Sequence, residues 1–225
     1  MKTAIVVFPG TSGEHEVYQV LTQYDVQVEI VSDLTTSLDA YDGIIIPGGF
    51  AYGDYLRSGA IAKLSPIMTE IKKAAEDGKL VLGIGNGFQI LLECNLLPGA
   101  MLPNADLKFK CCNVPVIVEN NQTAFTCDYQ EKAQLDLPIA HWAGNYYCDP
   151  VTLEQLEQQG QIVFRYHNNP NGSLNNIAGI INRKGNVLGI MARPERACDQ
   201  LLGSVDGSKL FSSMIRSWRD SNGLL

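Results

Sequence analysis

Apolar and polar positions follow two different patterns along the first hundred residues of the chain. Short, almost wholly apolar runs are typical of buried strands, whereas apolar positions three or four residues apart are typical of one face of a helix. The alternation of strands with helices predicts a parallel sheet whose ligands bind beyond the carboxyl ends of the strands. The expected strands are residues 4–8, 26–31, 42–46 and 80–82, and the expected helices are residues 14–23 and 61–77.

From residue 114 onward the apolar runs are shorter and are separated by turn residues, a texture typical of antiparallel strands. We therefore predict an α/β fold with a mostly parallel central sheet, helices on both of its faces, and antiparallel strands in the second half. No linker, charge block or repeat divides the chain, so we expect a single domain over residues 1–225. The expected later elements are strands at 116–118, 123–126 and 162–166, a hairpin of 177–181 with 187–191, and a helix at 209–219 that buries Leu210, Phe211, Met214, Ile215 and Trp218.

Composition and charge narrow the classes of partner. The formal net charge of −7 and the pI near 4.9 argue against a nucleic-acid backbone or an anionic membrane as the main partner. No apolar run approaches the roughly 18 residues that a membrane span needs. Six cysteines without a Cys-x-x-Cys pair and three scattered histidines predict neither a disulfide framework nor a metal site. We expect a cytoplasmic protein without metal or cofactor.

The segment 80–90 carries the strongest chemical signal, because a short apolar run ends in glycines and a helical pattern follows at once. A strand, a sharp turn and a helix in this order form a nucleophile elbow, in which small neighbours let one strained residue face a pocket. The N–H groups at the start of the helix favour negative charge that develops there. In Gly83-Ile84-Gly85-Asn86-Gly87 the place of the nucleophile is taken by Gly85, which has no side chain.

Two further segments are expected to end beside Gly85. Gly48 and Gly49 follow the strand at 42–46 and can offer backbone N–H groups to an oxyanion, because glycine tolerates a close approach. The segment 191–196 follows the last hairpin strand and carries Arg193 and Glu195. The sequence therefore predicts the frame of a catalytic site without its reacting atom.

Several dispersed stretches, in the same order, carry a resemblance that extends nearly from end to end. They include Ile-Pro-Gly-Gly-Phe at 46–50, Tyr-Gly-Asp-Tyr-Leu-Arg-Ser-Gly-Ala at 52–60, Asn-Gly-Phe-Gln-Ile-Leu at 86–91, Gly-Asn-Tyr-Tyr-Cys-Asp at 144–149 and Pro-Glu-Arg-Ala at 194–197. On these stretches the chain resembles the small glutaminase subunits of formylglycinamidine ribonucleotide synthase, which are class I (triad) glutamine amidotransferases of purine biosynthesis. The resemblance implies a flavodoxin-like fold and, as partner, a synthetase-like large subunit.

The resemblance also implies a catalytic cysteine at the elbow, a histidine that activates it, and a glutamate two residues later that orients the histidine. Gly85 stands at the cysteine position and Arg193 at the histidine position, so that only Glu195 remains of the triad. A guanidinium stays protonated at neutral pH and cannot act as a general base. Without a nucleophile or a base, we predict no glutaminase activity.

The resemblance places a pocket around the elbow. Trp142-Ala143 stand where the family has Gly-Glu, so a carboxylate is lost and we expect the large ring to occupy its space. His141, next to this ring, is expected to pack or to position a ligand. Loss of nucleophile, base and pocket residue together favours a natural degenerate paralogue over a single trapping substitution. The expected oxyanion and pocket residues are Gly48, Gly49, Asn86, Gln89, His141 and Trp142.

Three functions are compatible with these residues. The first is a pseudo-glutaminase that binds or scaffolds a formylglycinamidine ribonucleotide synthase-like partner. The second is a repurposed small-molecule site, in a sensor or an enzyme of another class, where Arg193 and the helix N-terminus bind a carboxylate or phosphate; alternatively, Arg193 pairs with Glu195 and plugs the pocket. The third is a purine-biosynthetic subunit that depends on external ammonia.

Overall fold

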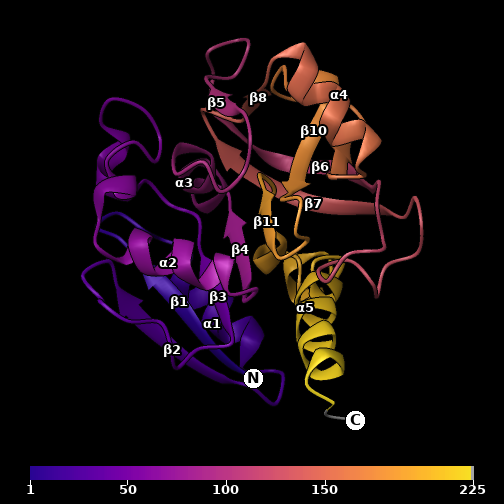
Figure 1. The fold of residues 1–225 in the computed structure, drawn as a ribbon. Coiled ribbons are helices and arrows are strands. Elements are labelled where there is room, and N and C mark those ends of the chain that lie inside the picture. The colour runs from indigo at the N-terminus through magenta and orange to yellow at the C-terminus, as the bar shows by residue number, and fades with distance from the viewer. Residues whose placement is uncertain (224–225) are drawn as a thin grey trace.

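The computed structural model describes residues 1–223 as a central sheet with helices packed against it (Figure 1). The sheet has nine strands in the order β2-β1-β3-β4-β11-β10-β9-β6-β7. Neighbouring strands from β2 to β11 pair in parallel, and those from β11 to β7 pair antiparallel. The predicted α/β class, with parallel strands first in the chain and antiparallel strands in the second half, is confirmed.

The strands predicted in the first half are all present. The helix predicted over 61–77 is in two pieces, because Ser65 is extended (ψ 144°) before Pro66 and separates a short 3₁₀ turn, η2 (Ala62–Leu64), from α2. A proline disfavours the helical conformation of the residue before it. The elements are β1 (Lys2–Val7), α1 (Glu14–Leu21), β2 (Gln27–Ser32), β3 (Gly43–Ile46), η1 (Ala51–Asp54), α2 (Ile67–Glu76), β4 (Leu80–Ile84) and α3 (Asn86–Glu93).

The second half agrees with the sequence in part. The strand predicted at 123–126 is wrong: the segment is a turn in which the Thr126 N–H donates to the Thr123 carbonyl at 3.1 Å. Trp218 is half-buried and not part of the buried face of its helix. The expected elements are β6 (Lys110–Val118), β9 (Ile162–Tyr166), β10 (Ile177–Ile181), β11 (Val187–Ile190) and α5 (Ser208–Ser221); those without a sequence prediction are β5 (Ala100–Leu102), β7 (Gln134–His141), β8 (Asn145–Tyr147), α4 (Pro150–Gln158), η3 (Leu174–Asn176), η4 (Pro194–Arg196) and η5 (Gln200–Leu202).

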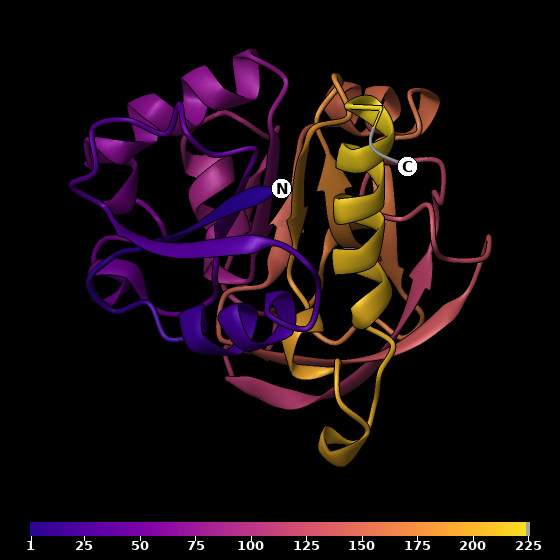
Figure 2. The ribbon, with the colours of Figure 1, turned by 90° about the horizontal axis from the view of Figure 1, so that it is seen from below.

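Two hydrophobic clusters lie on opposite faces of the sheet. Along β3, Ile44 and Ile46 belong to one cluster and Ile45 to the other, because successive side chains of a strand point to opposite faces. The first cluster includes buried residues of α2 and α3, and the second includes those of α1 and α5. Figure 2 shows α1 and α2 on opposite sides of β1 and β2. Burial of both faces accounts for the continuous apolar runs of the central strands.

Strand register brings three loops to one edge of the sheet. Ile46 at the end of β3 pairs with Gly83 of β4, and Ile84 at the end of β4 pairs with Ile190 of β11. Because these strands are parallel, the chain segments that follow them start side by side. Those segments contain Gly48, Gly85 and Arg193. No helix within residues 1–223 is both long enough and apolar enough to cross a membrane.

Candidate functional site

The turn between β4 and α3 has the geometry of an elbow. Gly85 joins the two elements with φ +54° and ψ −108°, a conformation that side-chain-bearing residues rarely adopt. Its N–H donates to the Ile190 carbonyl at 2.8 Å, and its carbonyl accepts from Gln89 N–H at 3.2 Å. A Cβ on Gly83 would lie 2.7 Å from the Gly87 carbonyl carbon, so the turn requires a small residue before it. The strand–turn–helix arrangement expected from the sequence is therefore present.

The elbow has room for a side chain at Gly85. A Cβ placed there would meet Arg193 Cδ at 3.5 Å and Gly48 Cα at 3.7 Å, which are ordinary van der Waals distances. Crowding is therefore not the reason for a glycine at this position. A side chain at position 85 would point toward the pocket. Arg193 is the side chain that lies closest to this position.

Arg193 lies in a cradle of glycines. It follows β11, its N–H donates to the Pro138 carbonyl at 2.8 Å, and only 4% of the residue is exposed. A Cβ on Gly48 would lie 2.6 Å from Arg193 Cζ, and a Cβ on Gly13 would lie 2.6 Å from Arg193 Nη2. The planar guanidinium thus fills space that side chains at these two glycines would otherwise take.

Four charged residues form a closed cluster around the guanidinium of Arg193. Arg193 Nε donates to Glu195 Oε1, and Arg193 Nη2 lies 3.6 Å from Glu16 Oε2. Glu16 Oε1 in turn accepts from Arg196 Nε at 2.9 Å. Two carboxylates and two guanidiniums therefore balance one another in the order Glu195–Arg193–Glu16–Arg196, and Arg193 and Glu16 are the two inner members. The alternative in which Arg193 pairs with Glu195 and plugs the pocket is the one that this geometry matches.

Burial controls the electrostatics of Glu195. Its side chain is fully excluded from solvent, and burial raises the pKa of the carboxyl while the neighbouring Arg193 opposes that rise. The second oxygen, Oε2, has no hydrogen-bond partner among the described residues. Removal of the guanidinium would leave this carboxylate without compensation, so Arg193 is the group that makes a charged Glu195 tolerable.

Gly48 and Gly49 lie beside the elbow and also support the turn after β1. The Gly48 carbonyl accepts from the N–H groups of Ser12 and Gly13 at 3.1 and 3.0 Å. A Cβ on Gly49 would lie 2.7 Å from the Gly10 carbonyl oxygen, so the two turns approach too closely for a larger residue. The glycines are thus required by packing whether or not an oxyanion binds there.

Asn86 and Gln89 connect loops through buried hydrogen bonds. Asn86 Oδ1 accepts from the Ala51 N–H at 2.9 Å, and Asn86 Nδ2 donates to Gln89 Oε1 at 2.8 Å. Gln89 Nε2 donates to the Ala143 carbonyl at 2.6 Å. Asn86 Nδ2 also lies 3.3 Å from Asp54 Oδ1, and burial raises the pKa of that carboxyl. These side chains hold the walls of the pocket together.

His141 is a buried, neutral wall residue. Asn171 Nδ2 donates to its Nε2 at 3.1 Å, which leaves the ring proton on Nδ1, and Nδ1 has no partner among the described residues. Burial, together with the positive charge of Lys110, lowers the pKa of His141 to about 4. Trp142 is 41% exposed, so its ring lies at the rim. Trp142 lines the cavity together with Arg193, so the ring contributes to the pocket wall from the rim, and its occupation of the pocket stays a prediction.

Most of the predicted residues, but not Gly48 or Glu195, line a cavity of about 10 Å³, which is roughly the room that one water molecule needs. Its lining includes Gly49, Gly85, Asn86, His141, Trp142 and Arg193. The sequence reasoning missed Glu16 and Asp54, which contact Arg193 and Asn86 from distant parts of the chain. Glu16 carried no signal beyond an acidic first helical turn, whereas Asp54 lay within the stretch 52–60 that resembles the glutaminase family.

Comparisons with known proteins agree with this architecture. A model of the CobB/CobQ-like glutamine amidotransferase domain family matches residues 1–219. A chain in the structure of PurLQS from Thermotoga maritima is 45% identical, with 96% of this chain and 97% of that chain covered and a TM-score of 0.89. That likeness confirms the flavodoxin-like amidotransferase fold.

More distant structures share the fold alone. A putative GMP synthase component from Thermoplasma acidophilum is 16% identical, with 100% of this chain and 97% of that chain covered and a TM-score of 0.69. The glutaminase domain of CTPS from Trypanosoma brucei, solved with bound acivicin, is 14% identical, with coverages of 98% and 94% and a TM-score of 0.65.

Proposed function

The chain belongs to the CobB/CobQ-like glutamine amidotransferase domain family, and we propose that it is a pseudo-glutaminase that binds or scaffolds a formylglycinamidine ribonucleotide synthase-like large subunit. It is a glutamine amidotransferase domain related to the subunit of that synthase. The observation that carries the proposal is the pairing of an elbow without a side chain, at Gly85, with a buried guanidinium beside it, at Arg193.

Hydrolysis of glutamine through a thioester needs a thiolate and a group that accepts and returns a proton. Gly85 supplies no nucleophile, and Arg193 holds its protons at neutral pH. Glu195 accepts a hydrogen bond from Arg193 and is shielded by it from the elbow. No side chain at the positions that match the triad can therefore start the reaction.

The small volume of the cavity at the elbow also argues against hydrolysis of glutamine. The cavity at the elbow has the volume of roughly one water molecule, so glutamine could bind only after Arg193 left its cradle. Departure of the guanidinium would break its contacts with Glu195 and Glu16 and leave a buried carboxylate unpaired. The ion cluster thus stabilises a closed pocket, which favours a binding role for the surface of the protein.

The decisive test measures ammonia released from glutamine by the purified chain, alone and with an excess of the synthetase large subunit of the same organism. We expect no release above background and a complex on size-exclusion chromatography. Turnover of glutamine would refute the absence of activity, and failure to form any complex would refute the scaffolding role. Growth of a purine-auxotrophic strain that lacks its glutaminase subunit, only when ammonia is supplied, would favour the subunit that depends on external ammonia.

A second candidate function, a small-molecule site for a carboxylate or phosphate, is favoured by one specific observation. His141 Nδ1 is buried and has no hydrogen-bond partner within residues 1–223, and His141 and the positively charged Arg193 both line the cavity at the start of α3. N–H donors of this kind suit an anion. The test is the melting temperature in the presence of glutamate or inorganic phosphate. A saturable rise that Arg193→Met abolishes would support the site, and no shift with either compound would exclude it.

A further inference from the structure

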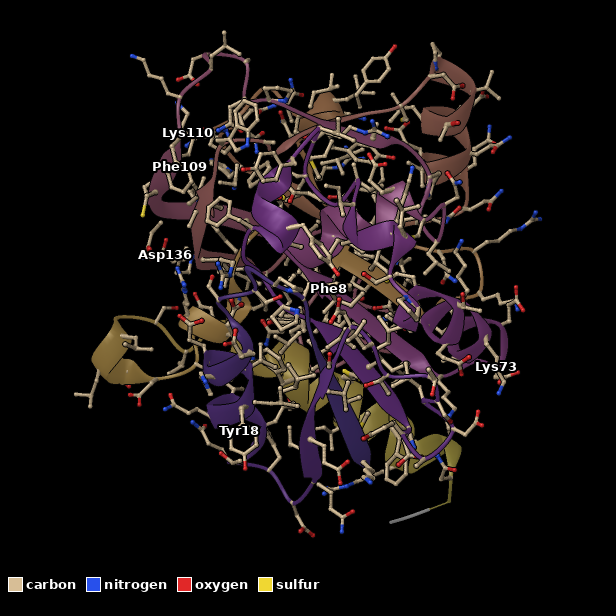
Figure 3. All side chains as sticks on the ribbon, turned by 90° about the vertical axis from the view of Figure 1, so that its left-hand side faces the viewer. Phe8, Tyr18, Lys73, Phe109, Lys110 and Asp136 are labelled. Atoms are coloured by element: carbon tan, nitrogen blue, oxygen red, sulfur yellow. The ribbon has the colours of Figure 1, made fainter. Side chains whose placement is uncertain are left out.

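A loop between η4 and α5 projects from the body of the protein. It spans residues 198–207 and contains η5 (Gln200–Leu202). In Figure 2 the gold loop stands away from the remaining ribbon at the lower edge, and in Figure 3 it extends to the left at a height between the labelled Tyr18 and Asp136. A projecting loop is usually polar at its tip, and this one is not.

The tip of the loop exposes large aliphatic side chains. Leu201 is 94% exposed and Leu202 is 65% exposed, and Val205 near the end of the loop is also exposed. Scattered exposed leucines are normal on protein surfaces, but adjacent ones on a projecting tip form a small apolar knob. We call Leu201, Leu202 and Val205 the loop knob.

Hydrogen bonds hold the loop in one conformation. Asp199 Oδ1 accepts from the Leu201 N–H at 2.9 Å, and Asp199 forms an isolated antiparallel bridge with Ser204. At the base, the Tyr129 hydroxyl donates to the Asp206 carbonyl at 2.7 Å, and Asp206 Oδ2 accepts from the Asp136 N–H at 2.8 Å. A knob that is already ordered loses little conformational entropy when a partner covers it.

A groove runs beside the loop knob. It has a volume of about 410 Å³ and lies between α1 and the loop, lined by Gln19, Val20 and Gln23 on one side and by Arg196, Asp199 and Leu202 on the other. A knob next to a groove can interlock with a partner that has the opposite relief, which is the shape complementarity that specific interfaces need.

The charges around the knob are negative and unbalanced. Asp136, Asp199 and Asp206 form no ion pair with any described residue, whereas the neighbouring Arg196 is neutralised by Glu16 at 2.9 Å. Asp199 and Asp206 belong to the loop itself. A complementary surface would therefore present an apolar socket bordered by lysine or arginine side chains.

We propose that the loop knob and its groove are the docking surface for the synthetase-like large subunit, whose matching face is an apolar socket with a basic border. This inference rests on the proposed function, because it assigns a place to the partner named there. The loop continues directly from η4, which carries Glu195 and follows Arg193, so a subunit docked on it would contact the segment that forms the buried ion cluster.

The test is calorimetric titration of the purified chain with the large subunit of the same organism. We expect Leu201→Ser and Leu202→Ser each to weaken binding about ten-fold or more, which is the usual scale for a truncated hot spot. Leu34→Ser is the matched control, because Leu34 is 68% exposed in another part of the chain, and it should leave the affinity unchanged. Asp199→Asn keeps an oxygen that can accept the Leu201 N–H but removes a charge, and it should weaken binding mainly at low salt.

The outcomes separate this inference from the proposed function. Binding of the wild type with unchanged affinity in both leucine variants would overturn the docking surface and leave the scaffolding role intact. Tyr55→Ser then identifies a competing surface, because Tyr55 is exposed in the loop that follows β3. If the wild type does not bind the large subunit, both the scaffolding role and this docking surface are refuted. Self-association of the chain that the leucine variants abolish would assign the knob to a second copy and contradict the proposal.

Discussion

Arg193 Nε donates to Glu195 Oε1 inside the protein, where the two side chains are 5% and 0% exposed. In a glutaminase the group two residues before the glutamate would be a base that the carboxylate orients. Here the same carboxylate binds a cation that cannot release its proton at neutral pH. In the proposed pseudo-glutaminase, the two residues keep the geometry of a catalytic pair, and charge compensation replaces proton transfer.

Removal of one partner of this pair should destabilise the protein strongly. We expect Arg193→Met to lower the free energy of unfolding by about 3–5 kcal/mol at neutral pH, because the buried Glu195 carboxylate loses its cation. Arg196→Met is the control: the Arg196 side chain is 34% exposed, and its loss should have a much smaller effect. Chemical denaturation measures the free energy of unfolding of both variants.

The stability lost in Arg193→Met should become smaller as the pH falls. Burial raises the folded-state pKa of Glu195 above its unfolded value, and the pKa rises further once the cation is gone. A charged Glu195 is therefore costly at pH values above its folded pKa, and this cost disappears as the pH falls and the carboxyl binds a proton. Arg193→Met should approach the wild type in stability on acidification, and Arg193→Met/Glu195→Gln should be less pH-dependent than the single variant. A constant difference at all pH values would contradict this explanation.

The glycine cradle of Arg193 makes a second prediction. A Cβ on Gly48 would lie 2.6 Å from Arg193 Cζ and force the guanidinium aside, so Gly48→Ala should cost about 1–3 kcal/mol of stability. In an Arg193→Ala background the clash is absent, and the same substitution should cost much less. Thermal and denaturant unfolding of the four proteins in this double-mutant cycle measure the coupling, and additive effects would show that the guanidinium does not occupy the cradle.

His141 makes the folded state sensitive to acid. Its pKa is lowered to about 4 from the ordinary 6.5, so the folded protein binds fewer protons than the unfolded chain between these values. Stability is therefore lost as the pH falls through this window, by about 3 kcal/mol in total. His141→Gln should flatten this part of the profile, whereas His15→Gln, which removes a mostly exposed ring, should not. Urea denaturation at pH values across this window measures the free energy of unfolding. An unchanged pH profile of stability in His141→Gln would contradict the prediction.

Restoration of the missing groups should restore chemistry. A Cβ at Gly85 has no close contact, although φ +54° strains any side chain there, so Gly85→Cys alone should fold with reduced stability but stay inactive, because Arg193 cannot accept the proton of the thiol. Gly85→Cys/Arg193→His should release ammonia from glutamine at a measurable rate, below that of intact glutaminases because the resemblance implies Gly-Glu where this chain has Trp142-Ala143. The ammonia assay compares the two variants with the wild type, and an inactive but folded double variant would mean that the pocket around the elbow is also lost.

The sequence predicted most of the core elements because their apolar patterns are local. Buried strands such as β3 and β4 have nearly uniform apolar runs, and helices such as α1 bury one stripe, so a window of ten residues contains the signal. α4 escaped prediction because its pattern is weak and it buries only Leu156. β7 was missed although every second position is buried, since Pro138 interrupts a sequence that otherwise alternates like a strand. The 123–126 segment has strand-forming residues, but hydrogen bonds between Thr123 and Thr126 close it into a turn.

The sequence alone determined that Gly85 stands at the elbow and that Arg193 and Glu195 follow the last hairpin strand, from which we predict the absence of a nucleophile. Those facts are covalent, so they hold in any conformation of the chain. Only the tertiary structure decided what Arg193 does with its charge, because its partners Glu16 and Gly48 are far from it in the sequence and reach it through parallel strand pairing. It also decided that Trp142 lies at the rim and that Leu201 and Leu202 face solvent, because burial depends on the packing of distant segments and not on hydrophobicity.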